Sequence, residues 1–216
     1  FQLKGDGDQY FLNLAMIRRT AQQAGVPFLN IVQACTWAPD AMRIPNADEL
    51  RYLVYTTAAY GAQGISYYVY AHPNHHGSLV GLDGTPGPLY HAVKSHNREF
   101  VAIAKELQPL RSLGVYHTSM RERGCEPLPS DAVFRIDSAS SPVSPRGFLL
   151  GFFGAGQRPT HVVVVNLDYT TEARATFVGP GVLEQFDAAT VQWTPANKAA
   201  VELTLPSGGG VLVRTR

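Results

Sequence analysis

The sequence has few cysteines, no excess of either charge and no long apolar run, and each shortage excludes a class of protein. Two cysteines, Cys35 and Cys125, are too few for a disulfide framework, and we interpret both as unpaired small apolar residues. Lysines and arginines total 18 against 17 aspartates and glutamates, and no basic run predicts a nucleic-acid partner. No apolar run approaches the roughly 18 residues of a membrane helix, so no membrane partner is expected.

The chain does have enough apolar sequence to build a core. Its 216 residues are 45% hydrophobic and 16% charged, which favours one large or two small folded domains over a disordered chain. It opens on Phe1, and we predict no signal peptide within these opening residues. We interpret this opening as the interior of a longer protein, and we therefore assign no compartment.

The first half of the chain alternates predicted helices with short apolar runs. A helix is predicted over 8–24, with Asp8 as its N-cap and Gly25 as the left-handed residue that ends it. The run 28–34 is too short for a typical helix and contains β-branched residues, so it predicts a buried parallel strand.

A second helix begins at a capping box in which Asn46 is followed three residues later by Glu49. One face of this helix is apolar or small, and Gly61 ends it. Its predicted face consists of Leu50, Leu53, Val54, Thr57 and Ala58. A second strand over 64–70 follows, then a long loop over 71–87 and a third helix over 88–107.

After Pro109 the pattern changes to short strands separated by proline and glycine turns, which is typical of an antiparallel sandwich. The predicted strands are 113–117, 132–136, 148–153, 161–166, 173–178, 190–194, 201–205 and 210–214. We therefore predict two domains, 1–110 and 111–216. The fold class is α/β plus all-β, with helices and parallel strands in the first half and a β-sandwich in the second.

Polar and aromatic side chains gather after the two predicted parallel strands, where ligands bind in βα folds. Aromatic rings offer flat apolar faces to a sugar, and amides and imidazoles bond its hydroxyls. The alternative is that the tyrosines are ordinary strand aromatics. The predicted substrate-binding residues are Gln33, Trp37, Tyr68, Tyr70, His72 and His75.

Metal and nucleophile sites find less support in the sequence. His72, His75 and His76 lie close together but in a loop, without the spacing that marks metal sites, so solvated histidines are the expected reading. No G-x-S-x-G elbow occurs, and the glycines of 207–210 precede a strand rather than a helix. We predict no metal and no cofactor.

A convincing pair of catalytic carboxylates is also missing. Glycoside hydrolysis needs two acids on either side of the bond, yet the first parallel strand ends in Gln33. We interpret Asp83 as part of an Asp-Gly turn and Asp40 as a surface loop acid. Glu49, in the capping box, and Glu99, inside a helix, are interpreted as structural. The catalytic residues are therefore unassigned.

The sequence nevertheless resembles one enzyme class in its first half. The segments YFLNLAMIRRTAQQAGVPFLNIVQ, LRYLVYTTAAYGAQGISYYVY and LYHAVKSHNREFVAIAKEL resemble the last third of the (β/α)8 barrel in β-galactosidase-like glycoside hydrolases of the two-glutamate clan. The resemblance covers about residues 8–118, and the remainder is similar to the β-sandwich that often follows such barrels.

The resemblance implies a partial TIM barrel in 1–110 and an accessory sandwich in 111–216. It also implies a nucleophilic Glu at the end of the seventh strand, where this sequence has Gln33, and a general acid after the fourth strand, upstream of this chain. Three explanations of Gln33 remain open: a different alignment, the use of other residues, or a binding or inactive relative.

We therefore predict the C-terminal portion of a glycoside hydrolase that acts on a β-galactoside-like or polysaccharide substrate and is inactive alone. Its expected partners are the carbohydrate and the missing N-terminal part of the barrel. The alternative is a non-catalytic carbohydrate-binding or scaffold protein on a degenerate barrel.

Overall fold

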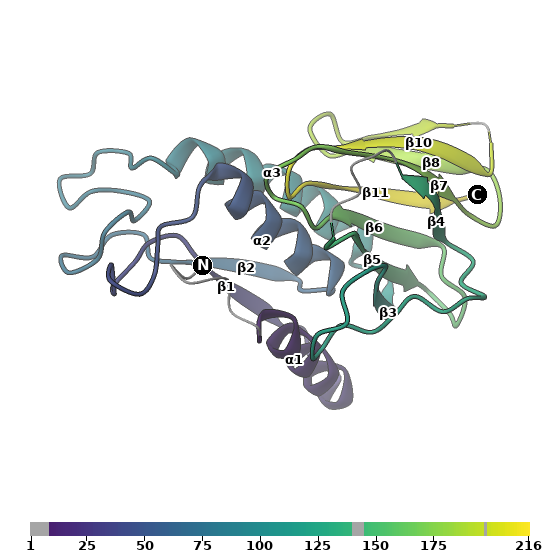
Figure 1. Ribbon diagram of the computed structural model, residues 1–216, viewed down its shortest axis with the longest axis horizontal. Helices are drawn as coiled ribbons and strands as arrows, with labels where there is room; N and C mark the ends of the chain where they lie inside the picture. Colours follow the sequence, from purple (N-terminus) through teal and green to yellow (C-terminus); the bar gives the residue numbers. More distant parts are fainter. Residues whose placement is uncertain (1–8, 140–144, 197) are drawn as a thin grey trace.

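The computed structural model describes residues 9–139, 145–196 and 198–216 of the chain. These residues form a mixed α/β structure in which sheet predominates and three helices occur (Figure 1). Within the same residues, no helix is long and apolar enough to cross a membrane. In chain order the elements are α1 (Tyr10–Ala24), β1 (Leu29–Gln33), α2 (Ala47–Ala59), β2 (Gly64–Tyr68), α3 (Tyr90–Leu107), β3 (Arg111–His117), β4 (Arg135–Ala139), β5 (Phe148–Gly154), β6 (His161–Asn166), β7 (Ala173–Val178), β8 (Leu183–Asp187), β9 (Gln192–Pro195), β10 (Ala200–Leu205) and β11 (Gly210–Thr215).

The helices of the first half begin and end close to where the sequence predicts. The Asn46 side chain accepts the Glu49 amide at 2.9 Å, and the Glu49 carboxylate accepts the Asn46 amide at 2.8 Å, which confirms the capping box. Gly25 ends α1 with φ of 65°, as a left-handed residue should. Asp8, the predicted N-cap of α1, lies outside the described residues.

β1 and β2 pair in parallel, as the sequence predicts, with Leu29 opposite Gly64 and Gln33 opposite Tyr68. Alternate residues point to opposite faces of this small sheet. One face lies against α2, where Asn30 donates a hydrogen bond to Thr57 at 2.8 Å and Val32 is buried. β2 ends at Tyr68, two residues earlier than predicted.

The other face of the β1–β2 sheet is open to solvent among the described residues. It carries Leu29, Ile31, Gln33, Gly64, Ser66 and Tyr68, which we call the uncovered face. Leu29 is 54% exposed and Ile31 is 62% exposed, although both are large aliphatic side chains. Within the part of the chain that the structure describes, the sheet order gives β1 and β2 no further strand on either side. A parallel sheet is normally covered on both faces, so the exposure of Leu29 and Ile31 is unusual for a parallel pair.

The second half forms a sandwich of two antiparallel sheets, as predicted. The larger sheet has the order β3-β5-β6-β11-β8-β9 and the smaller has the order β10-β7-β4. β8 is absent from the prediction because Glu184 and Gln185 interrupt its apolar pattern. Glu184 is nevertheless fully buried, since Arg214 and Arg216 each approach its carboxylate to 2.6 Å.

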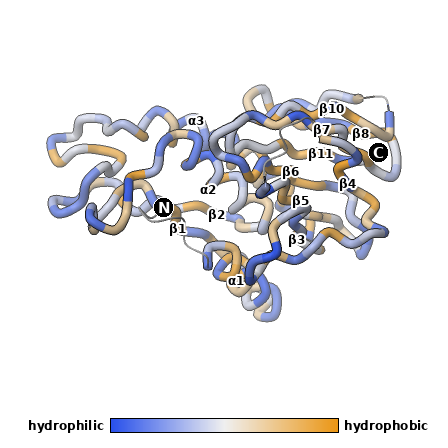
Figure 2. Tube along the Cα trace, in the orientation of Figure 1, coloured by the Kyte–Doolittle hydropathy of each residue, from blue (hydrophilic) through white to orange (hydrophobic). Residues whose placement is uncertain are grey.

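The central strands β5 and β6 of the six-stranded sheet are buried on both faces, which explains their continuous apolar runs (Figure 2). Leu149, Phe153, Val163 and Val165 face the helices and share one core with α2. The alternate positions Phe148, Leu150, Val162 and Val164 face the three-stranded sheet and form a second core. The predicted division at residue 110 falls in the connection between α3 and β3, and the first core extends across it.

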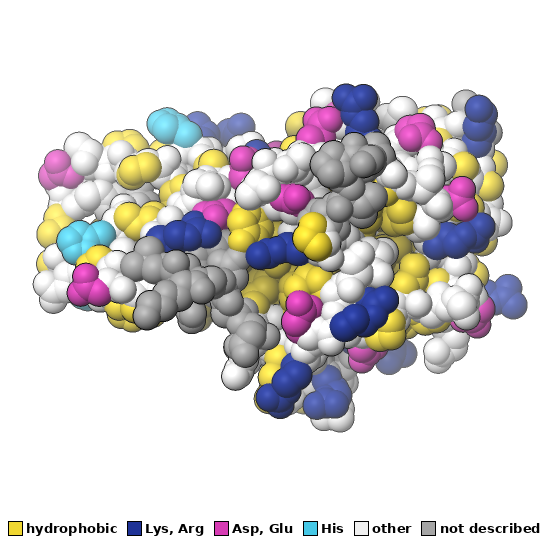
Figure 3. All heavy atoms as spheres, in the orientation of Figure 1, with side chains coloured by type: hydrophobic (Ala, Val, Ile, Leu, Met, Phe, Trp, Pro, Cys, Tyr) yellow, Lys and Arg dark blue, Asp and Glu magenta, His cyan; other side chains and the backbone are white. Residues whose placement is uncertain are grey.

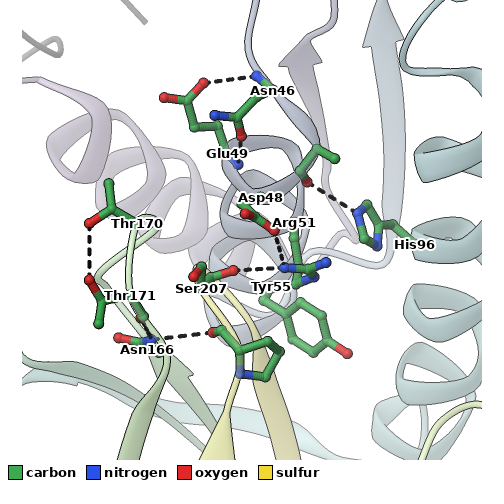
Figure 4. A network of polar contacts seen from close by, with 12 residues as sticks. Asn46, Asp48, Glu49, Arg51, Tyr55, His96, Asn166, Thr170, Thr171 and Ser207 are labelled. Carbon is green, nitrogen blue, oxygen red and sulfur yellow. Dashed lines mark hydrogen bonds and ion pairs between the residues drawn. The ribbon is translucent and has the colours of Figure 1, made fainter.

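α2 lies between the β1–β2 sheet and the sandwich and contacts α3, β1, β5 and β6. Two glycines of the sandwich allow this approach: a Cβ atom on Gly208 would lie 2.6 Å from the Asp48 oxygen, and one on Gly210 would lie 2.9 Å from the Tyr55 ring. Arg51 adds a polar contact by donating to the Ser207 carbonyl at 2.9 Å (Figure 4). The helix that supports β1 therefore also packs directly on the sandwich.

Candidate functional site

Four of the six predicted binding residues form one group at the carboxyl ends of β1 and β2. Trp37 stands at 81° to the Tyr68 ring with centroids 5.1 Å apart, so the two rings make a right-angled corner. His75 packs beside Tyr68 at 5.3 Å, and His72 packs on His75 at 4.1 Å. We call these four residues the aromatic–histidine cluster. Trp37 is 50% exposed and Tyr68 is 42% exposed, so the corner is open to a ligand.

The cluster lies on two loops that are fastened to each other. Thr36 and His76 exchange two backbone hydrogen bonds of 2.8 Å, which join the loop after β1 to the loop after β2. Figure 3 shows a histidine side chain at the end of the molecule that carries these loops in Figure 1. His76 therefore contributes through its backbone, next to the residues that carry the exposed rings.

Gln33 lies beside the cluster as the last residue of β1 and the register partner of Tyr68. Its amide nitrogen donates to the Cys35 carbonyl at 3.1 Å and to the Arg43 carbonyl at 2.8 Å. Both acceptors belong to the loop that carries Trp37. The Gln33 side chain thus contacts the base of this loop.

Tyr70, the sixth predicted residue, lies elsewhere because β2 ends before it. Its ring is 62% exposed and lines a groove along the free edge of β2, together with Leu79, Phe100 and Val101 of the neighbouring loop and α3. The binding role of the six residues remains a prediction. Four of them form the aromatic–histidine cluster, Gln33 lies next to it, and Tyr70 lies apart at the edge of β2.

Electrostatics favour the neutral form of His75. Desolvation and the neighbouring His72 lower the pKa of His75 below its usual value. The Tyr68 hydroxyl lies 3.0 Å from His75 Nε2, so the two side chains form a hydrogen bond. Flat apolar rings with hydroxyl and imidazole groups at their edges suit a neutral, hydroxylated ligand.

Two of the carboxylates considered from the sequence have structural partners. Glu49 is buried, caps α2 through Asn46 and pairs with Arg43 at 2.5 Å. Asp83 accepts the amide and hydroxyl of Thr85 at 3.0 and 2.7 Å, which holds the predicted turn and lowers the pKa of Asp83. Both groups stabilise loops and helix ends.

The other two acids also lie outside the cluster. Glu99, on α3, accepts the Tyr55 hydroxyl at 3.0 Å, and the adjacent His96 lowers the pKa of this carboxylate. Asp40 is exposed in the loop after β1. Among the described residues, none of the His, Cys, Asp and Glu side chains form a group of three that could hold a metal ion.

Sequence reasoning missed the residues that fasten the Trp37 loop. Thr36 is buried, and its hydroxyl donates to the Met42 carbonyl at 3.0 Å. Arg43 pairs with Glu49 at the far end of the same loop. The capping box gave a signal for Glu49, but a threonine in a loop carries no comparable pattern.

Comparisons with known proteins show similarity at the level of structure. Neither a comparison with protein-family models nor one with curated sequences found a match. The chain is similar to a solved family 39 glycoside hydrolase from the gut symbiont Bacteroides cellulosilyticus WH2, with a TM-score of 0.43 and 11% identity over 94% of this chain and 38% of that one. It is also similar to a protein described as a glycoside hydrolase, with a TM-score of 0.49 and 12% identity over 97% of this chain and 48% of that one. The chain thus spans less than half the length of each.

Proposed function

We propose that this chain is the C-terminal portion of a glycoside-hydrolase-like protein and that its aromatic–histidine cluster binds carbohydrate. The observation that carries the proposal is the right-angled corner of Trp37 and Tyr68 at the carboxyl ends of two parallel strands. One ring offers a floor for the apolar face of a sugar and the other a wall, while His75 and His72 lie beside them to bond hydroxyls.

The first half of the chain is, in this proposal, the last part of a (β/α)8 barrel. The uncovered face then lines the barrel interior, and further strands of a longer protein pair with the free edges of β1 and β2. Apolar exposure at three places supports it: Ile31 on the uncovered face, Ile17 on α1 and Val101 on α3 are all more than 40% exposed. In a complete barrel each of these side chains is covered by a neighbouring βα unit.

Hydrolysis in a longer protein would require at least one carboxylate from outside this chain, with a β-galactoside-like or polysaccharide substrate as the resemblance implies. A second candidate function, non-catalytic carbohydrate binding, is favoured by Gln33. The position that the resemblance gives to a nucleophilic Glu carries an amide, and this amide is hydrogen-bonded to the loop.

Binding is tested by titrating the chain with soluble oligosaccharides, beginning with lactose and with xylo- and cello-oligosaccharides. Isothermal titration calorimetry measures affinity without relying on Trp37 as a reporter. We expect one class to bind wild type, and we expect Trp37→Ala to lower that affinity at least tenfold. Tyr90→Ala is the control, because Tyr90 is a partly exposed aromatic residue on α3, away from the cluster. Equal loss in both variants, or binding that survives in Trp37→Ala, would contradict the proposal.

A further inference from the structure

The side-chain nitrogen of Gln33 bonds to both ends of the loop that follows β1. Its Nε2 lies 3.1 Å from the Cys35 carbonyl oxygen and 2.8 Å from the Arg43 carbonyl oxygen, which are two and ten residues further along the chain. A carbonyl oxygen only accepts hydrogen bonds, so the donor end of the amide must face both of them. The orientation of this side chain is therefore determined by its surroundings.

The loop held by Gln33 carries Trp37. Thr36, directly before the tryptophan, is fixed by its hydroxyl bond to Met42 and by its backbone pair with His76. The far end of the loop is fixed where Arg43 pairs with Glu49. Gln33 joins these two ends at Cys35 and Arg43, beneath the segment from which the indole projects.

We propose that Gln33 is a positioning residue, whose two hydrogen bonds hold the 34–45 loop so that the Trp37 ring stands against Tyr68. When neither bond is present, Cys35 and Arg43 lose their shared donor, and we expect the indole to leave the perpendicular arrangement that makes the corner. The inference rests on the proposed function only for the nature of the ligand, since the position of Trp37 is measurable without one.

The same geometry says what a carboxylate at this position would do. An ionised Glu has only acceptor oxygens, and it would face the Cys35 and Arg43 carbonyl oxygens at hydrogen-bonding distance without a proton between them. Such a contact is repulsive and opens the loop. In this chain the Trp37 loop therefore requires an amide at position 33. Gln33 orients the ring that contacts the ligand and does not act as a nucleophile.

The test uses the two tryptophans of the chain, Trp37 and Trp193, labelled as 5-fluorotryptophan and observed by fluorine NMR. Trp37→Phe assigns the two resonances. In Gln33→Met, which keeps the size of the side chain but removes its donor, we expect the Trp37 resonance to shift and broaden. The Trp193 resonance should stay in place, because that ring packs under Arg214 in the sandwich at 4.0 Å and reports an intact fold.

Gln33→Glu supplies a pH readout that a merely structural role would not give. At acidic pH the protonated carboxyl donates one hydrogen bond, so the Trp37 resonance should resemble wild type. As the pH rises and the carboxyl ionises, the resonance should move to the Gln33→Met position. A wild-type titration removes the contributions of the other groups at this end of the molecule, namely Cys35, Arg43, Glu49, Tyr68, His72, His75 and His76.

Two results would overturn the inference. The first is a Trp37 resonance that stays at the wild-type position in Gln33→Met and at every pH in Gln33→Glu, while Trp193 reports a folded chain. The second is a gain of hydrolysis of an aryl β-galactoside in Gln33→Glu, which would make position 33 a reacting group. If Trp37 moves as expected but no oligosaccharide binds wild type, the positioning role stands and the proposed function fails.

Discussion

Gly151 in β5 lies directly against the Ala59 carbonyl at the end of α2, so closely that a Cβ atom on Gly151 would overlap the Ala59 backbone. This contact brings the six-stranded sheet to backbone distance from the helix that supports β1 and β2. Gly208, in the turn before β11, and Gly210, the first residue of β11, approach the same helix. The first core, which spans both halves of the chain, depends on these three positions.

Gly151→Ala should destabilise the chain by about 1–3 kcal/mol, because the added methyl group forces the sheet away from α2. Urea unfolding followed by circular dichroism measures the change. Gly156→Ala is the matched control, since nothing lies within 4 Å of a Cβ atom at that position. Equal effects in the two variants would show that the contact with Ala59 contributes nothing.

A glutamate should affect stability very differently at two adjacent residues of β1, Ile31 and Val32. Ile31→Glu should change stability by less than about 0.5 kcal/mol, because Ile31 is 62% exposed on the uncovered face. Val32→Glu should cost about 3 kcal/mol or more, because Val32 is 2% exposed and a carboxylate there faces α2 without a partner. Thermal unfolding of both variants distinguishes the faces, and a severe loss in Ile31→Glu would mean that the uncovered face is covered.

The start of α2 should depend on the side chain of Asn46. Asn46→Ala removes the acceptor for the Glu49 amide and should cost about 1 kcal/mol, whereas Asn46→Asp keeps the cap and should stay near wild type. Chemical unfolding measures both. The expectation is wrong if alanine and aspartate give the same stability.

Burial of His117 should make the chain sensitive to acid. Burial lowers the pKa of His117 from 6.5 to about 4, and the ring lies 3.2 Å from the Tyr60 hydroxyl in the first core. The unfolded chain takes up a proton below about pH 6.5, while the folded chain resists it until about pH 4. Stability from this residue is thus complete above pH 6.5 and falls as the pH drops, by up to roughly 3 kcal/mol at pH 4.

His117→Phe removes this titration and should flatten the fall in stability between pH 6.5 and 4. Free energies of unfolding at several pH values, for wild type and variant, give the difference. His161 also has a pKa lowered by burial, and because it is present in both proteins its contribution cancels. An unchanged pH dependence in His117→Phe would assign the acid sensitivity to other groups.

Local signals predicted the helices and parallel strands well. The Asn46 capping box, the left-handed Gly25 and the buried face of α2 act within a few residues, so the sequence alone contains the physics that determines them. The antiparallel sandwich was also predicted, because proline and glycine turns separate its strands.

Features that depend on distant residues could not be predicted in the same way. The sequence did not predict β8, because Glu184 becomes buried only when Arg214 and Arg216, about thirty residues away, neutralise its charge. The Thr36–His76 pair joins loops forty residues apart, and no local pattern marks it. The role of Gln33 was hidden for a similar reason: its acceptors are backbone carbonyls, which every residue has.

α2 packs against both halves of the molecule. Only the three residues 108–110 connect α3 to β3. The two halves consequently share a helix instead of a hinge. The packing of α2 against both sheets therefore sets the angle between the Trp37 corner and the sandwich surface. A cargo attached at the C-terminus would thus keep a set orientation to any ligand held at that corner.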